Sequence, residues 1–192
     1  MTGFLVRDIA GRFSYQYEDI TIDNSGAGAN TPPPAQTSPG TQTGFQAYSN
    51  PTLGFTIEYP NAWEIFDTNN DQLYFYDPAE NGNVFVSVDV YQTDLAPDQA
   101  NDALLSQFLE SLQQQDGFQQ SSGDPLRLGG EVGPSAQYQF TDQNGMRVSG
   151  LVVCVTSPRT GLSYLVSLQA PSEIFSQHAE TLGAIADSMT IE

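Results

Sequence analysis

Alternating apolar and polar positions open the main body of the chain and predict two short strands joined by a corner. In Phe55–Tyr59 every second residue is apolar, and the residues between them are polar. Pro60 ends this strand, and Trp63, the single tryptophan, starts the next one. The pattern specifies architecture, and it supplies no nucleophile, metal ligand or phosphate loop.

The same alternation recurs along the rest of the chain and predicts further strands. In Val84–Tyr91 the four valines are expected to share one face. The tetrapeptide Asp142–Gly145 is a strong hairpin turn signal, and the segment after it is apolar on nearly every residue, which is typical of a strand covered on both faces. The other predicted strands are Trp63–Asp67, Leu73–Tyr76, Ala136–Phe140, Val148–Thr156 and Leu162–Leu168.

Two segments carry apolar residues at helical spacing. The first begins at Pro97-Asp98, where a proline in the first turn and an acidic residue near the positive end of the helix dipole favour a helix start. The second follows Pro171-Ser172 and carries a stripe that includes His178. Hairpin strands with one helix inserted and another at the end predict an α+β fold, an antiparallel sheet flanked by helices on both faces.

The first part of the chain divides differently. Residues 1–23 show strand-like alternation, and residues 24–43 have the Pro, Gly, Thr and Gln composition of a flexible linker. The folded domain is expected to span 44–192. A strand-like arm on a linker either folds back on its own sheet or binds another protein. Its candidate partner-binding residues are Phe4, Phe13, Tyr15, Tyr17, Ile20 and Ile22.

The charge balance excludes several classes of function. The chain has 23 acidic and 5 basic residues, a net charge of −18, and all of its basic residues are arginine. Such a chain is repelled by nucleic-acid backbones and by anionic lipid surfaces, so we expect neither as a partner. Without lysine, Schiff-base catalysis and a phosphate-loop lysine are impossible. Solubility is the simplest explanation of the acidity, and a cation-binding role is the alternative.

Five residues at the start of the body resemble the opening "GF…P..W" signature of the PsbP family, the extrinsic proteins of photosystem II and their bacterial, Mog1-like relatives. They are Gly54, Phe55, Tyr59, Pro60 and Trp63. The order of elements that follows is also similar to that family over about Phe45–Glu192: the strand Asn83–Gln92, the helix Pro97–Gln114, the hairpin Gln137–Pro158, and the closing strand and helix.

The resemblance implies an α/β/α sandwich and a non-enzymatic protein that serves as a subunit or assembly factor of a larger complex. It also implies a location in the thylakoid lumen, the periplasm or the cell surface. The segment Met1–Val6 is too short and lacks the basic start of a signal peptide, so a cytoplasmic location stays open. Plant members are lysine-rich and bind an acidic membrane-protein surface through basic residues, whereas this chain has no lysine.

A catalytic pair of Cys154 and His178, assisted by Glu180 or Asp187, is the enzyme hypothesis. His178 lies on the apolar stripe of the last predicted helix, and Cys154 lies inside an apolar strand, where cysteine behaves as a small hydrophobe. Packing therefore explains both residues, and we expect no catalytic site and no organic cofactor. A hydrolase that uses this pair ranks third among the hypotheses.

The candidate metal site consists of three aspartate side chains, because calcium prefers carboxylate oxygen ligands. They are Asp67, Asp71 and Asp77. The spacing does not match an EF-hand loop, and turn formation explains Asp residues there equally well. The leading hypothesis is therefore a protein-binding module. The alternative is an extracytoplasmic domain that binds calcium or a small ligand in a pocket between the sheet and a helix.

Overall fold

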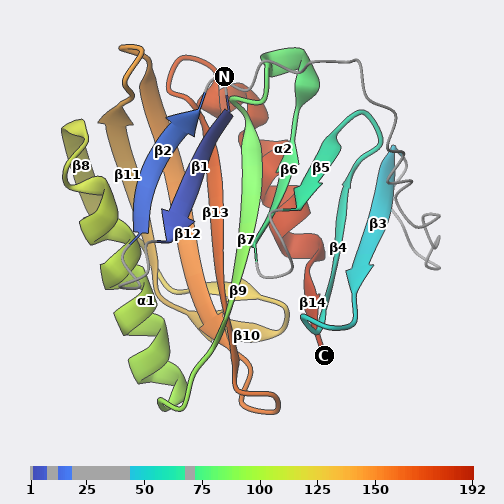
Figure 1. Cartoon of the computed structure of the whole chain (residues 1–192). Helices are drawn as coiled ribbons and strands as arrows, with labels where there is room; N and C mark the ends of the chain where they lie inside the picture. Colours follow the sequence, from blue (N-terminus) through green and yellow to red (C-terminus); the bar gives the residue numbers. More distant parts are fainter. Residues whose placement is uncertain (1, 8–12, 19–43, 68–71) are drawn as a thin grey trace.

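A seven-stranded antiparallel sheet forms the centre of the molecule (Figure 1). The computed structural model describes residues 2–7, 13–18, 44–67 and 72–192. The strand order is β5-β6-β7-β13-β12-β11-β8, so β5 and β8 form the two edges. The strands are β5 Glu64–Asp67, β6 Gln72–Tyr76, β7 Phe85–Gln92, β8 Asp116–Ser122, β11 Ser135–Thr141, β12 Arg147–Thr156 and β13 Leu162–Pro171.

Three smaller groups of strands surround this sheet. A second antiparallel sheet has the order β14-β4-β3, with β3 at Phe45–Asn50, β4 at Phe55–Pro60 and β14 at Thr190–Ile191. Two hairpins form separate two-stranded sheets among the described strands: β1 (Thr2–Arg7) with β2 (Phe13–Glu18), and β9 (Leu126–Leu128) with β10 (Glu131–Gly133). A 3₁₀ turn, η1, spans Pro78–Glu80.

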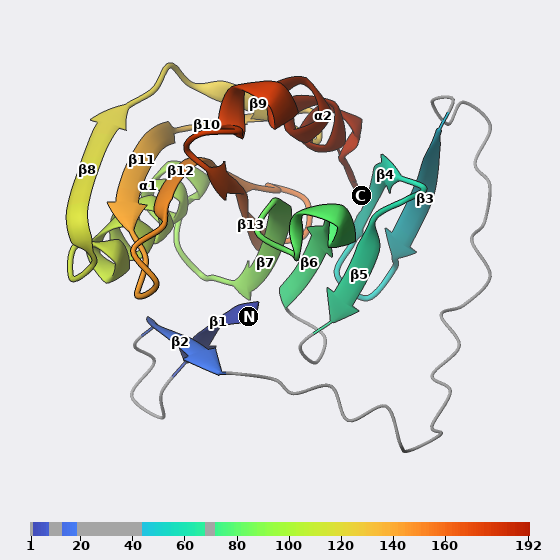
Figure 2. The ribbon, with the colours of Figure 1, turned by 90° about the horizontal axis from the view of Figure 1, so that it is seen from above.

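The two helices cover opposite faces of the central sheet (Figure 2). Helix α1 (Pro97–Leu112) packs on β11, β12 and β13, and helix α2 (Phe175–Ser188) packs on β13, β7 and β4. The hairpin β1–β2 lies on the same side of the sheet as α1. The predicted antiparallel sheet with helices on both faces is confirmed. No helix in the described part of the chain is long and apolar enough to span a membrane.

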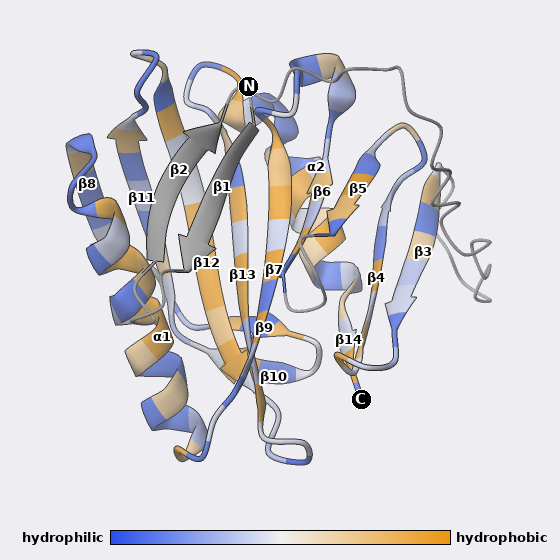
Figure 3. Cartoon of the chain, viewed as in Figure 1, coloured by the Kyte–Doolittle hydropathy of each residue, from blue (hydrophilic) through white to orange (hydrophobic). Residues whose placement is uncertain are grey.

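Each face of the sheet has its own hydrophobic core. The α2-side core contains Trp63 and the four valines of Val84–Val90, and the α1-side core contains Phe108, Leu112 and Tyr138. Strand β12 contributes to both: Val153 and Val155 face α2, whereas Val152 and Cys154 face α1. The apolar bands along β12 and β13 are visible in Figure 3. This double burial explains why nearly every residue of the strand is apolar.

The signature residues hold the small sheet against the large one. Gly54 has a φ of +65°, a left-handed conformation that glycine adopts without strain. The Tyr164 hydroxyl of β13 donates to the carbonyl oxygen of Leu53 at 2.8 Å, and the Glu192 amide donates to the carbonyl of Gly54 at 2.9 Å. Phe55 is fully buried. The motif therefore joins β4, β13 and the C-terminal residues.

Some elements were absent from the sequence-based prediction. Strand β3, strand β8 and the β9–β10 hairpin, which includes Gly129–Gly133, were not predicted. In the structure this segment contains the turn of the β9–β10 hairpin together with β10. Gly129 has a φ of +60°, and a Cβ atom there would lie 2.4 Å from the Ile191 Cγ1 atom. The glycine therefore permits both the turn and the close approach of β14.

Candidate partner-binding surface

The structure separates the two residues of the hypothetical catalytic pair. Cys154 lies on the α1 side of the sheet and is fully buried, whereas His178 lies on α2, which covers the opposite side. Burial, with a smaller contribution from the negative charge of Asp89, raises the pKa of the Cys154 thiol. A buried thiol with a raised pKa is a poor nucleophile. The geometry does not bring the two side chains together.

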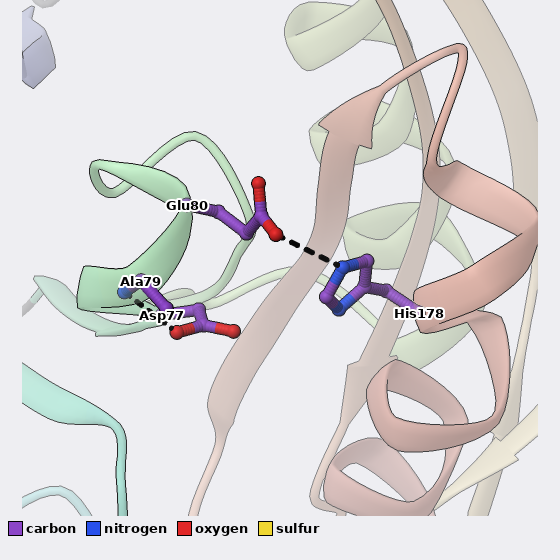
Figure 4. A network of polar contacts seen from close by, with 4 residues as sticks. All are labelled: Asp77, Ala79, Glu80 and His178. Carbon is purple, nitrogen blue, oxygen red and sulfur yellow. Dashed lines mark hydrogen bonds and ion pairs between the residues drawn. The ribbon is translucent and has the colours of Figure 1, made fainter.

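His178 instead faces the 3₁₀ turn η1 (Figure 4). Its Nε2 atom lies 3.9 Å from Glu80 Oε1, and the two side chains are 20% and 41% exposed. The Asp77 carboxylate accepts a hydrogen bond from the Ala79 amide at 2.9 Å and so caps the same turn. The sequence predicted that His178 packs against the sheet, but the residue is absent from the core and makes this partly exposed contact.

The candidate calcium ligands do not form one described cluster. Asp67 lies opposite Leu73 at one end of β6, and Asp77 follows Tyr76 at the other end. The strand between them keeps the two carboxylates on the order of 10 Å apart. Asp71 lies outside the described residues. Within the described ranges, no three acidic, histidine or cysteine side chains are grouped as a metal site would require.

The predicted arm residues fall partly on the β1–β2 hairpin. Phe4 lies in β1, and Phe13, Tyr15 and Tyr17 lie in β2. The register pairs Tyr15 with Leu5 and Phe4 with Gln16. Ile20 and Ile22, like the linker 24–43, lie outside the described residues. The hairpin forms a sheet of its own, and helix α1 of the body contacts β2.

A cleft opens between α2 and the β8 end of the sheet. Its volume is about 480 Å³, within the range of ligand-binding pockets in proteins. Apolar residues of α2 and neighbouring strands form one wall, including Phe175, Leu182 and Leu151. Polar residues of β8 and β11 form the other, namely Gln119, Gln120, Ser121, Gln137 and Gln139. The cleft lies between the sheet and a helix, the position that the small-ligand hypothesis assigned to a pocket.

No residue that lines this cleft carries an ionisable carboxylate or a basic group. Calcium sites in proteins are usually built around carboxylates, so the cleft is a poor site for calcium. Sequence analysis did not identify the residues that line the cleft, because β8 was not predicted. The available signal was the alternation in Ser135–Thr141, where Gln137 and Gln139 are exposed between buried residues.

Comparison with known proteins agrees with this geometry. The sequence matches the PsbP family over residues 43–191, a span that contains every element from β3 to β14. The chain belongs to the PsbP family. The resemblance inferred from the opening signature is thereby confirmed. No match is found among curated proteins.

Solved structures with low sequence identity share the PsbP-family fold. Cyanobacterial PsbP (CyanoP) from Synechocystis sp. PCC 6803 has a TM-score of 0.55 and 16% identity, over 82% of this chain and 98% of CyanoP. The Ran-binding protein Mog1p of Saccharomyces cerevisiae has a TM-score of 0.53 and 10% identity, over 77% and 95%. LpqN of Mycobacterium tuberculosis, involved in cell envelope biogenesis, has a TM-score of 0.50 and 18% identity, over 71% and 82%.

Proposed function

We propose that this PsbP-family chain is a non-catalytic subunit or assembly factor that binds a protein partner through its surface and its N-terminal arm. The observation that carries the proposal is the β1–β2 hairpin, which forms a two-stranded sheet of its own among the described strands. An isolated two-stranded hairpin is marginally stable in water, so it needs a surface to pack against. Helix α1 contacts β2 in the structure, and a partner protein could supply such a surface in its place.

The chemistry of the body supports a binding role. The only cysteine is buried on the face of the sheet opposite His178, and both helices use their apolar faces in the two cores. The net charge of −18 favours a partner with a basic surface and disfavours nucleic acid. Protein binding also has a precedent in the fold, since Mog1p is described as a Ran-binding protein.

An extracytoplasmic location is part of the proposal, and photosynthetic membranes are one setting for it. It rests on the PsbP match and on the structural likeness to CyanoP and LpqN. Immunogold labelling or fractionation of the native host tests it directly, and recovery of the protein in the cytoplasmic fraction would contradict it.

The test of the binding role is a matched pair of arm variants. The partner is first isolated by chemical crosslinking of the native protein and identified by mass spectrometry. In the alternating segment Phe13–Tyr17, Tyr15→Asp places a negative charge at an apolar position. Gln16→Asp places the same charge at the neighbouring polar position. We expect Tyr15→Asp to weaken the complex by about tenfold or more and Gln16→Asp to leave it nearly unchanged. Equal affinities for the two variants would contradict the proposal.

A further inference from the structure

Among the described residues, one edge of the central sheet lacks the charge protection that sheet edges usually carry. Edge strands expose unpaired backbone groups, and charged side chains discourage their pairing with other chains. The edge strand β5 is short and carries exposed Glu64 and Asp67. The opposite edge, β8, is longer, and Gln119–Ser122 are exposed and uncharged. The β8 edge is therefore open to pairing, whereas charge protects the β5 edge.

The register identifies the backbone groups that face outward from β8. The Gly123 amide donates to the Ser135 carbonyl of β11 at 2.9 Å, so the backbone of Gly123 points inward. The pairing of β8 with β11 keeps this register through Gln119. Because inward and outward backbone groups alternate along an antiparallel strand, Gln120 and Ser122 direct their N–H and C=O groups away from β11. These are the groups that another strand would bind.

The cleft lies beside this edge. Gln119 and Ser121 line it together with Gln137 and Gln139 of β11, and the apolar wall of α2 stands across from them. When an extended peptide joins a sheet edge, main-chain hydrogen bonds provide affinity, and pockets for alternate side chains provide specificity. Strand β8 and the cleft supply both parts.

We propose that β8 binds an extended segment of a partner protein as an added strand, with side chains of that segment entering the α2 cleft. The proposal deepens the proposed function and rests on it. The segment is uncharged at its centre, because the cleft lining contains no acidic or basic residue. It is basic at its flanks, because Asp116 and Asp124 stand at the two ends of β8 in a chain of net charge −18.

The probe is a fluorescent synthetic peptide with a centre of threonine, valine and glutamine and lysines at both ends. A second peptide replaces the lysines with glutamates. Binding is measured by fluorescence anisotropy on the full chain at low and high salt. We expect the lysine-flanked peptide to bind, the glutamate-flanked peptide to bind about tenfold or more weakly, and salt to reduce the difference.

A matched pair of variants at one position separates the backbone from the side chain. Gln120→Pro removes an outward N–H and leaves the β8–β11 ladder intact, a placement that edge strands tolerate. Gln120→Ala removes the side chain and keeps the N–H. We expect the proline variant to bind the lysine-flanked peptide about tenfold or more weakly and the alanine variant to match the parent chain.

A second pair tests the cleft. A Cβ atom at Gly183 would meet no atom within 4 Å, so the position has room for a larger side chain. Gly183→Leu is expected to fill the cleft and weaken peptide binding severalfold, with Gly183→Ala as the control that keeps it open. Amide chemical-shift changes on titration are expected at Gln120, Ser122 and Gly183.

Several outcomes would overturn the inference. They are absence of peptide binding, equal binding by the Gln120→Pro variant, and shift changes confined to other strands. Sedimentation that shows a dimer lost in the Gln120→Pro variant would make a second copy of the chain the occupant and would also overturn it. If the native partner binds the Gln120→Pro variant normally but loses the Tyr15→Asp variant, this inference fails and the proposed function stands. If the native chain has no partner, the proposed function fails.

Discussion

The ring of Tyr138 on β11 lies directly over Gly150 on β12. The two residues are opposite each other in the register, and a Cβ atom on Gly150 would lie 2.2 Å from the Tyr138 Cζ atom. The ring also packs edge-on against Phe108 of α1, with centroids 5.4 Å apart, and its hydroxyl lies 2.7 Å from Ser167 Oγ. Because Gly150 has no side chain, the buried ring of Tyr138 can contact α1, β12 and β13 at once.

Gly150→Ala is expected to destabilise the fold by about 1–3 kcal/mol, because the tyrosine ring must move out of a packed core. Urea unfolding followed by circular dichroism measures the change. Gly183→Ala is the control, since its Cβ meets open space in α2, and removing a helical glycine stabilises by up to about 1 kcal/mol. Equal stability of the Gly150→Ala variant and the parent chain would show that the ring does not occupy this space.

Cys154 is expected to be unreactive in the folded protein. The residue is fully buried, and burial raises its thiol pKa, so little thiolate is present at neutral pH. Alkylation followed by mass spectrometry should modify the thiol only in denaturant. Rapid, complete labelling of the native chain would mean that the strand opens or that the thiol is accessible.

Tyr76 links stability to alkaline pH. Burial, followed by the hydrogen bond to Glu64 and the charge of that carboxylate, raises the pKa of Tyr76 to about 12, whereas a tyrosine in the unfolded chain titrates near 10. The contribution is present below pH 10 and is lost as the pH rises from about 10 to 12, because the unfolded state loses its proton first.

The stability difference between the parent chain and the Tyr76→Phe variant isolates this residue from the other tyrosines. Unfolding free energies measured from pH 8 to pH 12 should show that the advantage of the parent chain falls across that window. A difference that stays constant would mean that Tyr76 has an ordinary pKa in the fold.

Calcium is expected to leave the protein unchanged. Asp67 and Asp77 lie at opposite ends of β6, and the cleft contains no carboxylate. Titration by calorimetry should give no binding heat, and the melting temperature should not shift. A saturable heat signal that Asp71→Asn abolishes would restore the carboxylate hypothesis.

Periodicity predicted the core of the fold because each face of the central sheet is buried by a helix. The valines of β7 and the apolar residues of β12 lie in these buried cores, so their apolar pattern is visible in the sequence. Strand β8 was missed because its exposed residues, Gln119–Ser122, have no apolar alternation. An edge strand buries little, so its pairing depends on β11 rather than on its own pattern.

The candidate sites were harder to predict than the fold. Sequence spacing placed His178 on an apolar stripe, but it could not show that η1 reaches that turn of α2 with Glu80. The cleft needs β8, β11 and α2 together, three elements that are not consecutive in the sequence. Such sites depend on tertiary contacts that no local pattern contains.

The most direct test of the central claim is the affinity of the crosslinked partner, once purified, for the full chain and for a chain of residues 44–192. The PsbP match covers nearly the whole of this shorter chain, and circular dichroism checks that it is folded. We predict a folded body whose affinity for the partner is lost. A truncated body that binds the partner with unchanged affinity would contradict the role of the arm.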